Sequence, residues 1–274
     1  MSSDDEPPEM DPRSYYDSDP EAEWERLETD PVGRLEFEST VAELRERLPA
    51  EGRVLDAGGG PGRYSDWLAE QGYEPVHCDL SGELTRYART TAGPALPTAQ
   101  ADVRALPYEP GSFDGVCCLG GVLSHVVDAD ERAAALAELR RVARPGAPVF
   151  VSVIGLLSAL RYQLKHALGE HDALLTHLAA TGDYTAEAVA EHAGGNGWAE
   201  CHFFRVEELE TELRAAGFTI ERSVGLEGIA SLLHDELSGA SEASLDSVRA
   251  VVDATRREPP VADVSEHFLT VARA

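Results

Sequence analysis

The stretch RVLDAGGGPGR at residues 53–63 joins a short apolar run to a glycine-rich turn. The apolar run ends in Asp56, and the glycines that follow alternate with other residues at Gly58, Gly60 and Gly62. Glycine tolerates positive φ and lets the backbone approach a ligand closely. Pro61 suits the start of a helix, whose free N–H groups bind polar groups. The stretch therefore predicts a strand, a tight turn and a helix, with a ligand on the turn.

Two residues of this stretch distinguish between possible ligands. A dinucleotide-binding turn requires a third glycine three places after the second, where this chain has Arg63. The carboxylate of Asp56 would repel a pyrophosphate, whereas it attracts the ammonium of an amino acid, directly or through water. The turn therefore favours S-adenosylmethionine over NAD. A turn whose glycines serve packing alone stays an alternative.

Two further acids follow at regular intervals. Asp79 ends the apolar run PVHCD, 23 residues after Asp56, and Asp102 lies another 23 residues on. Because the carboxyl ends of parallel strands meet at one edge of a sheet, these acids should share one groove. We expect Asp79 to accept the hydroxyls of a ribose. Asp102 suits the amino group of an adenine, with the Val103 N–H beside the ring.

Strand-like and helix-like stretches alternate after residue 50, which is typical of an α/β fold. We predict a Rossmann-like, doubly wound, seven-stranded and mostly parallel sheet with a helical insertion after strand five. The expected strands are residues 54–57, 75–78, 98–101, 113–119, 148–154, 218–224 and 266–273. The expected helices are residues 33–48, 62–71, 82–91, 130–143, 206–216 and 226–257.

Composition predicts where the domain begins and where an insertion interrupts it. The first 30 residues hold twelve acids and two arginines, so residues 1–12 are expected to be a disordered acidic tail. Residues 13–274 then form one domain. Within it, residues 156–200 are polar and helical and should form a lid. We expect Arg161, Tyr162, Tyr184 and Trp198 of this lid to line the acceptor pocket.

Four motifs together resemble one family. VLDAGGGPGR, CDLS, ADVRALPYEPGSFD and LRRVARPGAPVFVSV are similar to the class I S-adenosylmethionine-dependent methyltransferases, in their UbiE-like small-molecule branch, over roughly residues 50–155. The family's strand-five turn is commonly PGG, and Ala147 replaces its last glycine here. The residues predicted to contact the cofactor are Asp56, Gly58, Gly60, Gly62, Asp79, Leu80, Asp102, Val103, Leu119 and Gly120. Tyr16 resembles a tyrosine that covers the cofactor in this family, although helix packing explains it equally well.

Methyl transfer mainly requires the acceptor to be aligned and water to be excluded, so a dedicated base is not essential. If one exists, His125 after strand four is the best placed, and His202 after the insertion is second. Each histidine could instead have a structural role. The other histidines of the insertion have no compact ligand spacing, so no metal site is expected.

The charge balance is strongly acidic, with 50 Asp and Glu against 23 Lys and Arg and a net charge of −27. Lys165 is the only lysine, and the composition resembles that of halophilic proteomes. Clustered basic residues, which nucleic-acid binding needs, are missing from the sequence. The four cysteines have no metal-ligand or redox spacing and are expected to be reduced core thiols. With no leader-like start and no apolar run near 18 residues, we expect a cytoplasmic protein without membrane spans.

Such a surface repels itself in dilute buffer, and this repulsion is screened when the Debye length falls to about 3 Å, near 1 M salt. We therefore expect the melting temperature to rise between low and molar KCl. A scanning calorimetry series in KCl checks this, and a melting temperature that does not rise would contradict the expected salt dependence.

The sequence thus predicts an enzyme that transfers a methyl group from S-adenosylmethionine to O, N or C of a small molecule. Two alternatives stay open. The string DAGGG resembles the turn of a bacterial tRNA-nucleoside methyltransferase, and a non-catalytic S-adenosylmethionine-binding protein would carry the same turn. NAD-dependent oxidoreduction is disfavoured by Arg63 and Asp56.

Overall fold

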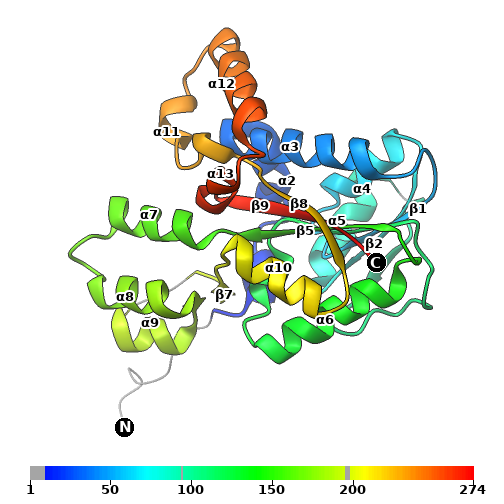
Figure 1. The fold of residues 1–274 in the computed structure, drawn as a ribbon, viewed down its shortest axis with the longest axis horizontal. Helices are drawn as coiled ribbons and strands as arrows, with labels where there is room; N and C mark the ends of the chain where they lie inside the picture. Colours follow the sequence, from blue (N-terminus) through cyan, green and yellow to red (C-terminus); the bar gives the residue numbers. More distant parts are fainter. Residues whose placement is uncertain (1–9, 94, 195–197) are drawn as a thin grey trace.

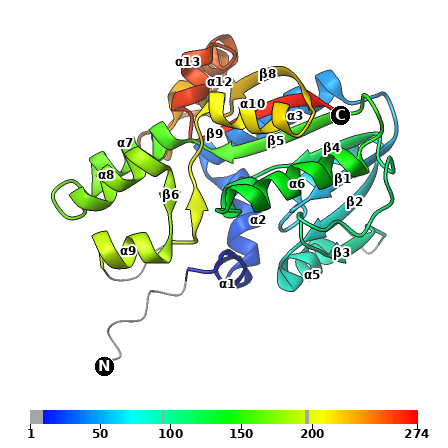
Figure 2. The same ribbon diagram turned by 60° about the horizontal axis from the view of Figure 1, so that its bottom comes forward.

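The computed structural model describes residues 10–93, 95–194 and 198–274. Its centre is a seven-stranded sheet in the order β3-β2-β1-β4-β5-β9-β8 (Figures 1 and 2). Pairs from β3 to β5 are parallel, whereas β9 is antiparallel to both neighbours. The strands are β1 (Arg53–Ala57), β2 (Glu74–Asp79), β3 (Thr98–Gln100), β4 (Gly115–Cys118), β5 (Pro148–Ile154), β8 (Thr219–Gly225) and β9 (His267–Arg273).

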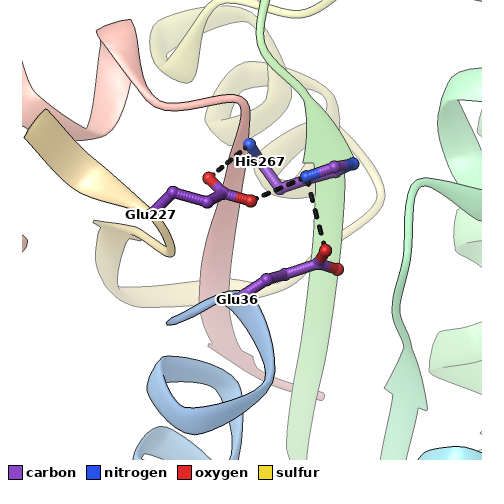
Figure 3. Close-up of side chains that lie close together, drawn as sticks. All are labelled: Glu36, Glu227 and His267. Atoms are coloured by element: carbon purple, nitrogen blue, oxygen red, sulfur yellow. Dashed lines mark hydrogen bonds and ion pairs between the residues drawn. The ribbon is translucent and has the colours of Figure 1, made fainter. Parts of the chain in front are cut away.

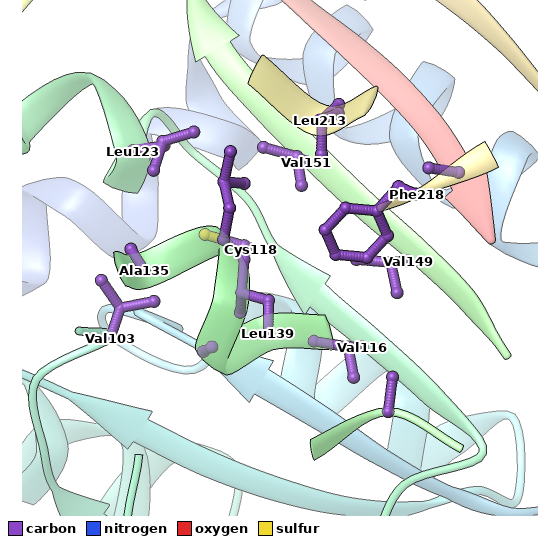
Figure 4. Packing of buried hydrophobic residues seen from close by; sticks show 14 of the residues in the cluster. Val103, Val116, Cys118, Leu123, Ala135, Leu139, Val149, Val151, Leu213 and Phe218 are labelled. Atoms are coloured by element: carbon purple, nitrogen blue, oxygen red, sulfur yellow. The ribbon is translucent and has the colours of Figure 1, made fainter. Parts of the chain in front are cut away.

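Helices cover both faces of this sheet. The α-helices of the central part are α3 (Pro31–Arg47), α4 (Arg63–Glu70), α5 (Gly82–Thr91), α6 (Ala129–Val142) and α10 (Val206–Ala215). The side chains of β4 alternate between the two faces of the sheet, and each face packs against its own helices. Val116 and Cys118 pack with α6 and α10 on one face, and Cys117 packs with α3 and α4 on the other. Figure 4 shows the first of these faces, with Leu139 of α6 and Leu213 of α10 among the strand residues.

The predicted fold class is confirmed, and most predicted elements differ from the observed ones by one or two residues at each end. Two predictions were wrong in extent. The fourth strand is only Gly115–Cys118, because Phe113 makes an isolated bridge and the chain turns at Gly120 with φ of +70°. Residues 226–257 form no single helix. They divide into η2 (Gly228–Ala230), α11 (His234–Leu237) and α12 (Glu242–Thr255), with α13 (Pro259–Val264) after them.

The N-terminal segment differs from the expected tail. Residues 1–9 lie outside the described part of the chain, whereas residues 10–12 are ordered. The Met10 side chain is buried, and its carbonyl accepts a hydrogen bond from the Glu200 N–H at 2.8 Å. The Asp11 carboxylate then caps α1 (Pro12–Asp17), which is followed by α2 (Pro20–Thr29). Burial of an apolar side chain and a helix cap together order a segment that its charge alone predicts to be disordered.

The insertion after β5 has a core of its own. It holds α7 (Leu156–His166), α8 (Asp172–Thr181), α9 (Ala186–His192) and a small sheet of β6 (Asp183–Tyr184) and β7 (Cys201–His202). Both views show α7, α8 and α9 projecting from one side of the main sheet (Figures 1 and 2). The prediction of helices here is confirmed, whereas the small sheet was not predicted.

All four cysteines are buried and unpaired, as expected of core thiols. Among the described residues, none of the helices is long and apolar enough to cross a membrane.

Candidate functional site

A cavity of about 690 Å³ lies at the carboxyl edge of the parallel strands. Its walls come from the turns after β1, β2, β3 and β4, and α1 and α2 contribute residues on the other side. Cavities of roughly 300–1,000 Å³ are typical of sites for small molecules and cofactors. The position agrees with the rule that open α/β sheets bind ligands beyond the carboxyl ends of their strands.

The glycine turn forms one wall of this cavity. Gly58 and Gly60 have φ of +70° and +55°, which side chains rarely adopt. The N–H groups of Gly58 and Gly59 both donate to the Cys78 carbonyl, which ties the turn to β2. A Cβ at Gly60 would meet no atom within 4 Å, so it would enter the cavity itself. The turn is therefore a cradle that a side chain would fill.

Gly62 lies where two helices pack against each other. It lies outside the cavity lining, and a Cβ there would come within 2.8 Å of the Ala88 Cβ. It precedes α4 with φ of +92° and allows α4 and α5 to pack closely. The predicted contact of Gly62 with the cofactor stays a prediction, which this packing role does not test.

Asp79 lies at the edge of the cavity with its carboxylate fixed. The Gly60 N–H and the Ser81 N–H each donate to one of its oxygens at 2.8 Å. Burial raises the pKa of this carboxyl group, and the two backbone donors oppose that shift. Asp79 thus links the glycine turn to the start of α5, at the position predicted for a ribose-binding acid.

Asp102 also lines the cavity, and Arg104 holds it from the side. The Arg104 Nε donates to both carboxylate oxygens, at 2.9 and 3.0 Å, and these hydrogen bonds lower the Asp102 pKa. Arg104 in turn pairs with Glu131 at the start of α6. Neither partner was predicted: Arg104 lies within the motif ADVRALPYEPGSFD but has no role assigned from it, and Glu131 lies outside every motif. The other predicted residues that line the cavity are Leu80, Val103, Leu119 and Gly120.

Asp56 is fully buried beneath the turn and does not line the cavity. The Ser65 hydroxyl donates to its Oδ2 at 2.7 Å, while Oδ1 has no hydrogen-bond partner among the residues that the structure describes. Burial raises the pKa of this carboxyl group, and the nearby His77 opposes the shift. The predicted contact of Asp56 with the cofactor, directly or through water, stays a prediction. Asp56 supports the turn from below.

His125 and Tyr16 meet at the side of the cavity that α1 covers. The Tyr16 hydroxyl lies 2.9 Å from His125 Nε2, and His125 Nδ1 lies 2.8 Å from the Glu200 carbonyl oxygen. All three residues line the cavity. A carbonyl oxygen only accepts, so Nδ1 carries the proton. Burial lowers the pKa of His125, which keeps the ring neutral, and Nε2 therefore accepts from Tyr16.

His202, the second predicted base, is not at the cavity. Its Nδ1 lies 2.5 Å from Asp183 Oδ1 and its Nε2 lies 3.0 Å from Glu208 Oε1. These carboxylates raise the His202 pKa against the effect of burial. Because both ring nitrogens contact carboxylates of β6 and α10, the structural alternative is favoured for His202, and its catalytic role stays a prediction. Its role in this structure is to join the insertion to the core.

The residues predicted to line an acceptor pocket from the insertion do not reach the cavity. Arg161 points toward the Val264 carbonyl oxygen, at 3.3 Å, and Tyr162 is 51 % exposed. The Tyr184 hydroxyl accepts from the Trp198 N–H, and the Trp198 ring packs edge-on against His125 from behind. The insertion therefore supports the cavity through Glu200 and Trp198, and the covering elements are α1 and α2.

A buried ionic network begins at the cavity and continues into the core. Arg26 of α2 lines the cavity, and its Nη1 donates to Glu36 Oε2 at 2.5 Å. The ring of His267 lies between two acids, with Nδ1 at 3.6 Å from Glu36 and 2.8 Å from Glu227 (Figure 3). These acids raise the pKa of His267 to about 9. Sequence reasoning missed this network, because it joins α2, α3, β9 and the segment before η2.

Glu36, Glu227 and His267 also have the ligand atoms of a metal site, all within 4.8 Å of one another. The two buried carboxylates already face cations of the chain, since His267 pairs with Glu227 and Arg26 pairs with Glu36. We therefore interpret the cluster as an internal ion network.

Residues 54–146 match the family model described as a methyltransferase domain. The chain is 37 % identical over 125 residues to the ubiquinone biosynthesis O-methyltransferase of Xanthomonas euvesicatoria, covering 44 % of this chain and 48 % of that protein. It is 36 % identical over 121 residues to the demethylmenaquinone methyltransferase of Beutenbergia cavernae, covering 44 % and 48 %.

Among solved structures, an S-adenosylmethionine-dependent methyltransferase of Methanosarcina mazei has a TM-score of 0.58 at 20 % identity, covering 84 % of this chain and 96 % of that one. This similarity supports the fold. The chain spans about half the length of the curated relatives that it matches.

Proposed function

We propose that this chain is a class I S-adenosylmethionine-dependent methyltransferase, whose cavity binds S-adenosylmethionine and directs the methyl group to a small molecule. The observation that carries the proposal is the cradle at the glycine turn. Gly60 and Gly120 both have positive φ and open space where a Cβ would lie, and the Asp79 carboxylate is fixed between the turn and α5. Such a wall admits a ligand close to the backbone and presents an acceptor to its hydroxyls.

The cavity residues fit the parts of the cofactor in the order of the strands. Asp79 would accept the ribose hydroxyls, and Asp102 with the Val103 N–H would face the adenine. The methionine part of the cofactor would be surrounded by Gly58, Gly60, Leu119 and Gly120. When bound, the cofactor supplies an activated methyl group on a sulfonium, so this chain has to orient the acceptor and exclude water. The helices α1 and α2 perform the second task.

The relatives in the comparisons support a small-molecule acceptor, since they include a malonyl-[acyl-carrier protein] O-methyltransferase and quinone-pathway enzymes. The tRNA alternative is not favoured, because the chain carries a net charge of −27 and phosphate contacts require basic clusters.

We also propose that the protein is cytoplasmic and that the interior of its cell is rich in salt. The acidic composition and the four reduced thiols support this proposal.

Isothermal calorimetry in molar KCl tests the proposed cofactor. We expect S-adenosylmethionine and S-adenosylhomocysteine to bind with a stoichiometry of one, and NAD to give no heat of binding. Binding of NAD alone would contradict the proposal. A second assay distinguishes an enzyme from a protein that only binds the cofactor. Tritium from methyl-labelled cofactor is followed into a metabolite extract of a halophilic organism, and a protein that only binds the cofactor transfers no label.

A further inference from the structure

The orientation of His125 selects a class of acceptor. The ring is fixed at both nitrogens, with Nδ1–H on the Glu200 carbonyl and Nε2 facing the Tyr16 hydroxyl. This leaves Nε2 as the proton acceptor and Tyr16 as its donor. The Tyr16 oxygen still has lone pairs, and both Tyr16 and His125 line the cavity. An acceptor in the cavity can therefore donate a hydrogen bond to Tyr16, which already donates to a base.

We propose that the methyl acceptor carries a phenolic or enolic hydroxyl, which donates to Tyr16 Oη and passes its proton through Tyr16 to His125 Nε2. This inference rests on the proposed function. The acceptor oxygen forms its bond to the methyl carbon while the carbon–sulfur bond of the sulfonium breaks and sulfur keeps the electron pair. The acceptor proton moves to Tyr16 Oη as the Tyr16 proton moves to Nε2, which leaves a methyl ether, a thioether and an imidazolium.

The chemistry of proton removal favours a hydroxyl over an amine. A neutral amine has a free lone pair and can lose its proton after the new bond has formed, so it gains little from a base. A hydroxyl becomes strongly acidic only as its oxygen is methylated, and a base placed at that proton lowers the barrier. Burial keeps His125 a weak base, which matches an acidic hydroxyl better than an alcohol.

The residues around Tyr16 and His125 hold the two side chains together in the absence of a ligand. The rings of Tyr16 and Trp198 both pack edge-on against His125, with centroids at 5.3 and 5.6 Å. Two further hydrogen bonds hold α1, the helix that carries Tyr16. The Ser81 hydroxyl donates to the Asp17 carboxylate, and the Glu200 N–H donates to the Met10 carbonyl just before the helix. Tyr16 is therefore fixed at His125 by contacts that do not depend on a ligand.

Binding of phenol and aniline to the full chain, in the presence of saturating S-adenosylhomocysteine, tests the acceptor class. These probes differ in the donor group alone. We expect phenol to bind at least tenfold more tightly than aniline, and Tyr16→Phe to remove this preference. Tyr15→Phe is the matched control, because Tyr15 lies on the same helix outside the cavity lining. Equal binding of the two probes, or an unchanged preference in Tyr16→Phe, would overturn the inference.

Nitrogen-15 NMR of labelled histidine tests the proton path in the same samples. We expect an unprotonated Nε2 in His125, and a shift of its resonance when phenol is added to the unmodified chain but not to Tyr16→Phe. A protonated Nε2 in the neutral ring would overturn the path. The two levels of the proposal stay distinguishable. If S-adenosylhomocysteine fails to bind, the proposed function fails, whereas intact cofactor binding without the phenol effects removes only the hydroxyl acceptor.

Discussion

A Gly60→Ala variant is expected to bind S-adenosylmethionine about 100-fold more weakly than the unmodified chain, a loss of ~2.8 kcal/mol. The added Cβ would meet no protein atom within 4 Å and would occupy the cavity where the cofactor must approach the turn. The variant also carries strain, because Gly60 has φ of +55°. Calorimetry with S-adenosylmethionine measures the change in affinity.

Gly72→Ala separates the effect of strain from the effect of occupied space. Gly72 has φ of +89° and open space around its Cβ position, but it lies outside the cavity, in the turn between α4 and β2. Both variants should lose roughly 1–2 kcal/mol of stability through the left-handed conformation. Only Gly60→Ala should lose affinity. Equal affinities in the two variants would show that the turn does not approach the ligand.

A His267→Asn variant should lose several kcal/mol of unfolding free energy at pH 7 and much less at a pH above 9. The acids Glu36 and Glu227 raise the His267 pKa to about 9 in the folded chain, against about 6.5 when it is unfolded. A pKa that is raised on folding adds stability in full below the unfolded value. This contribution, about 3 kcal/mol, is lost as the pH rises through the folded value.

Urea unfolding at pH 7 and at pH 9.5 measures this difference. His166→Asn is the control, since His166 is an exposed residue at the end of α7. His234, whose pKa is also raised to about 10, is present in every variant and so cancels in the comparison. A penalty for His267→Asn that is equal at both pH values would show that the ring does not carry a proton in the folded chain.

The side of the cavity that the strand ends form was largely predictable because it is built locally. The turn residues Gly58 and Gly60 lie within one strand–turn–helix unit, and parallel pairing brings Asp79 and Asp102 to the same edge. Two of the predicted residues, Asp56 and Gly62, lie outside the cavity lining. A motif does not state which way a residue faces, and here the Asp56 side chain is buried in the core, whereas the Cβ position of Gly62 faces Ala88 of α5.

The opposite side was predictable only in part. His125 and Tyr16 were each identified as candidates, one from its place after strand four and the other from resemblance. Their contact joins residues 109 positions apart, and Glu200 joins His125 from 75 positions away. Packing between distant elements decides such contacts, and no local pattern in the sequence encodes it. The same reason explains why α1 and α2, rather than the insertion, cover the cavity.

The seven-stranded sheet, its glycine turn and the acids at the strand ends thus follow from local sequence patterns, because hydrophobic periodicity and turn chemistry act over neighbouring residues. The direction in which each side chain points depends instead on how distant elements pack. Such packing places His125 between Tyr16 and Glu200, binds both nitrogens of His202 to carboxylates, and buries His267 between two glutamates. The physical reason is that a histidine's proton and charge depend on its spatial neighbours, and these come from distant parts of the chain.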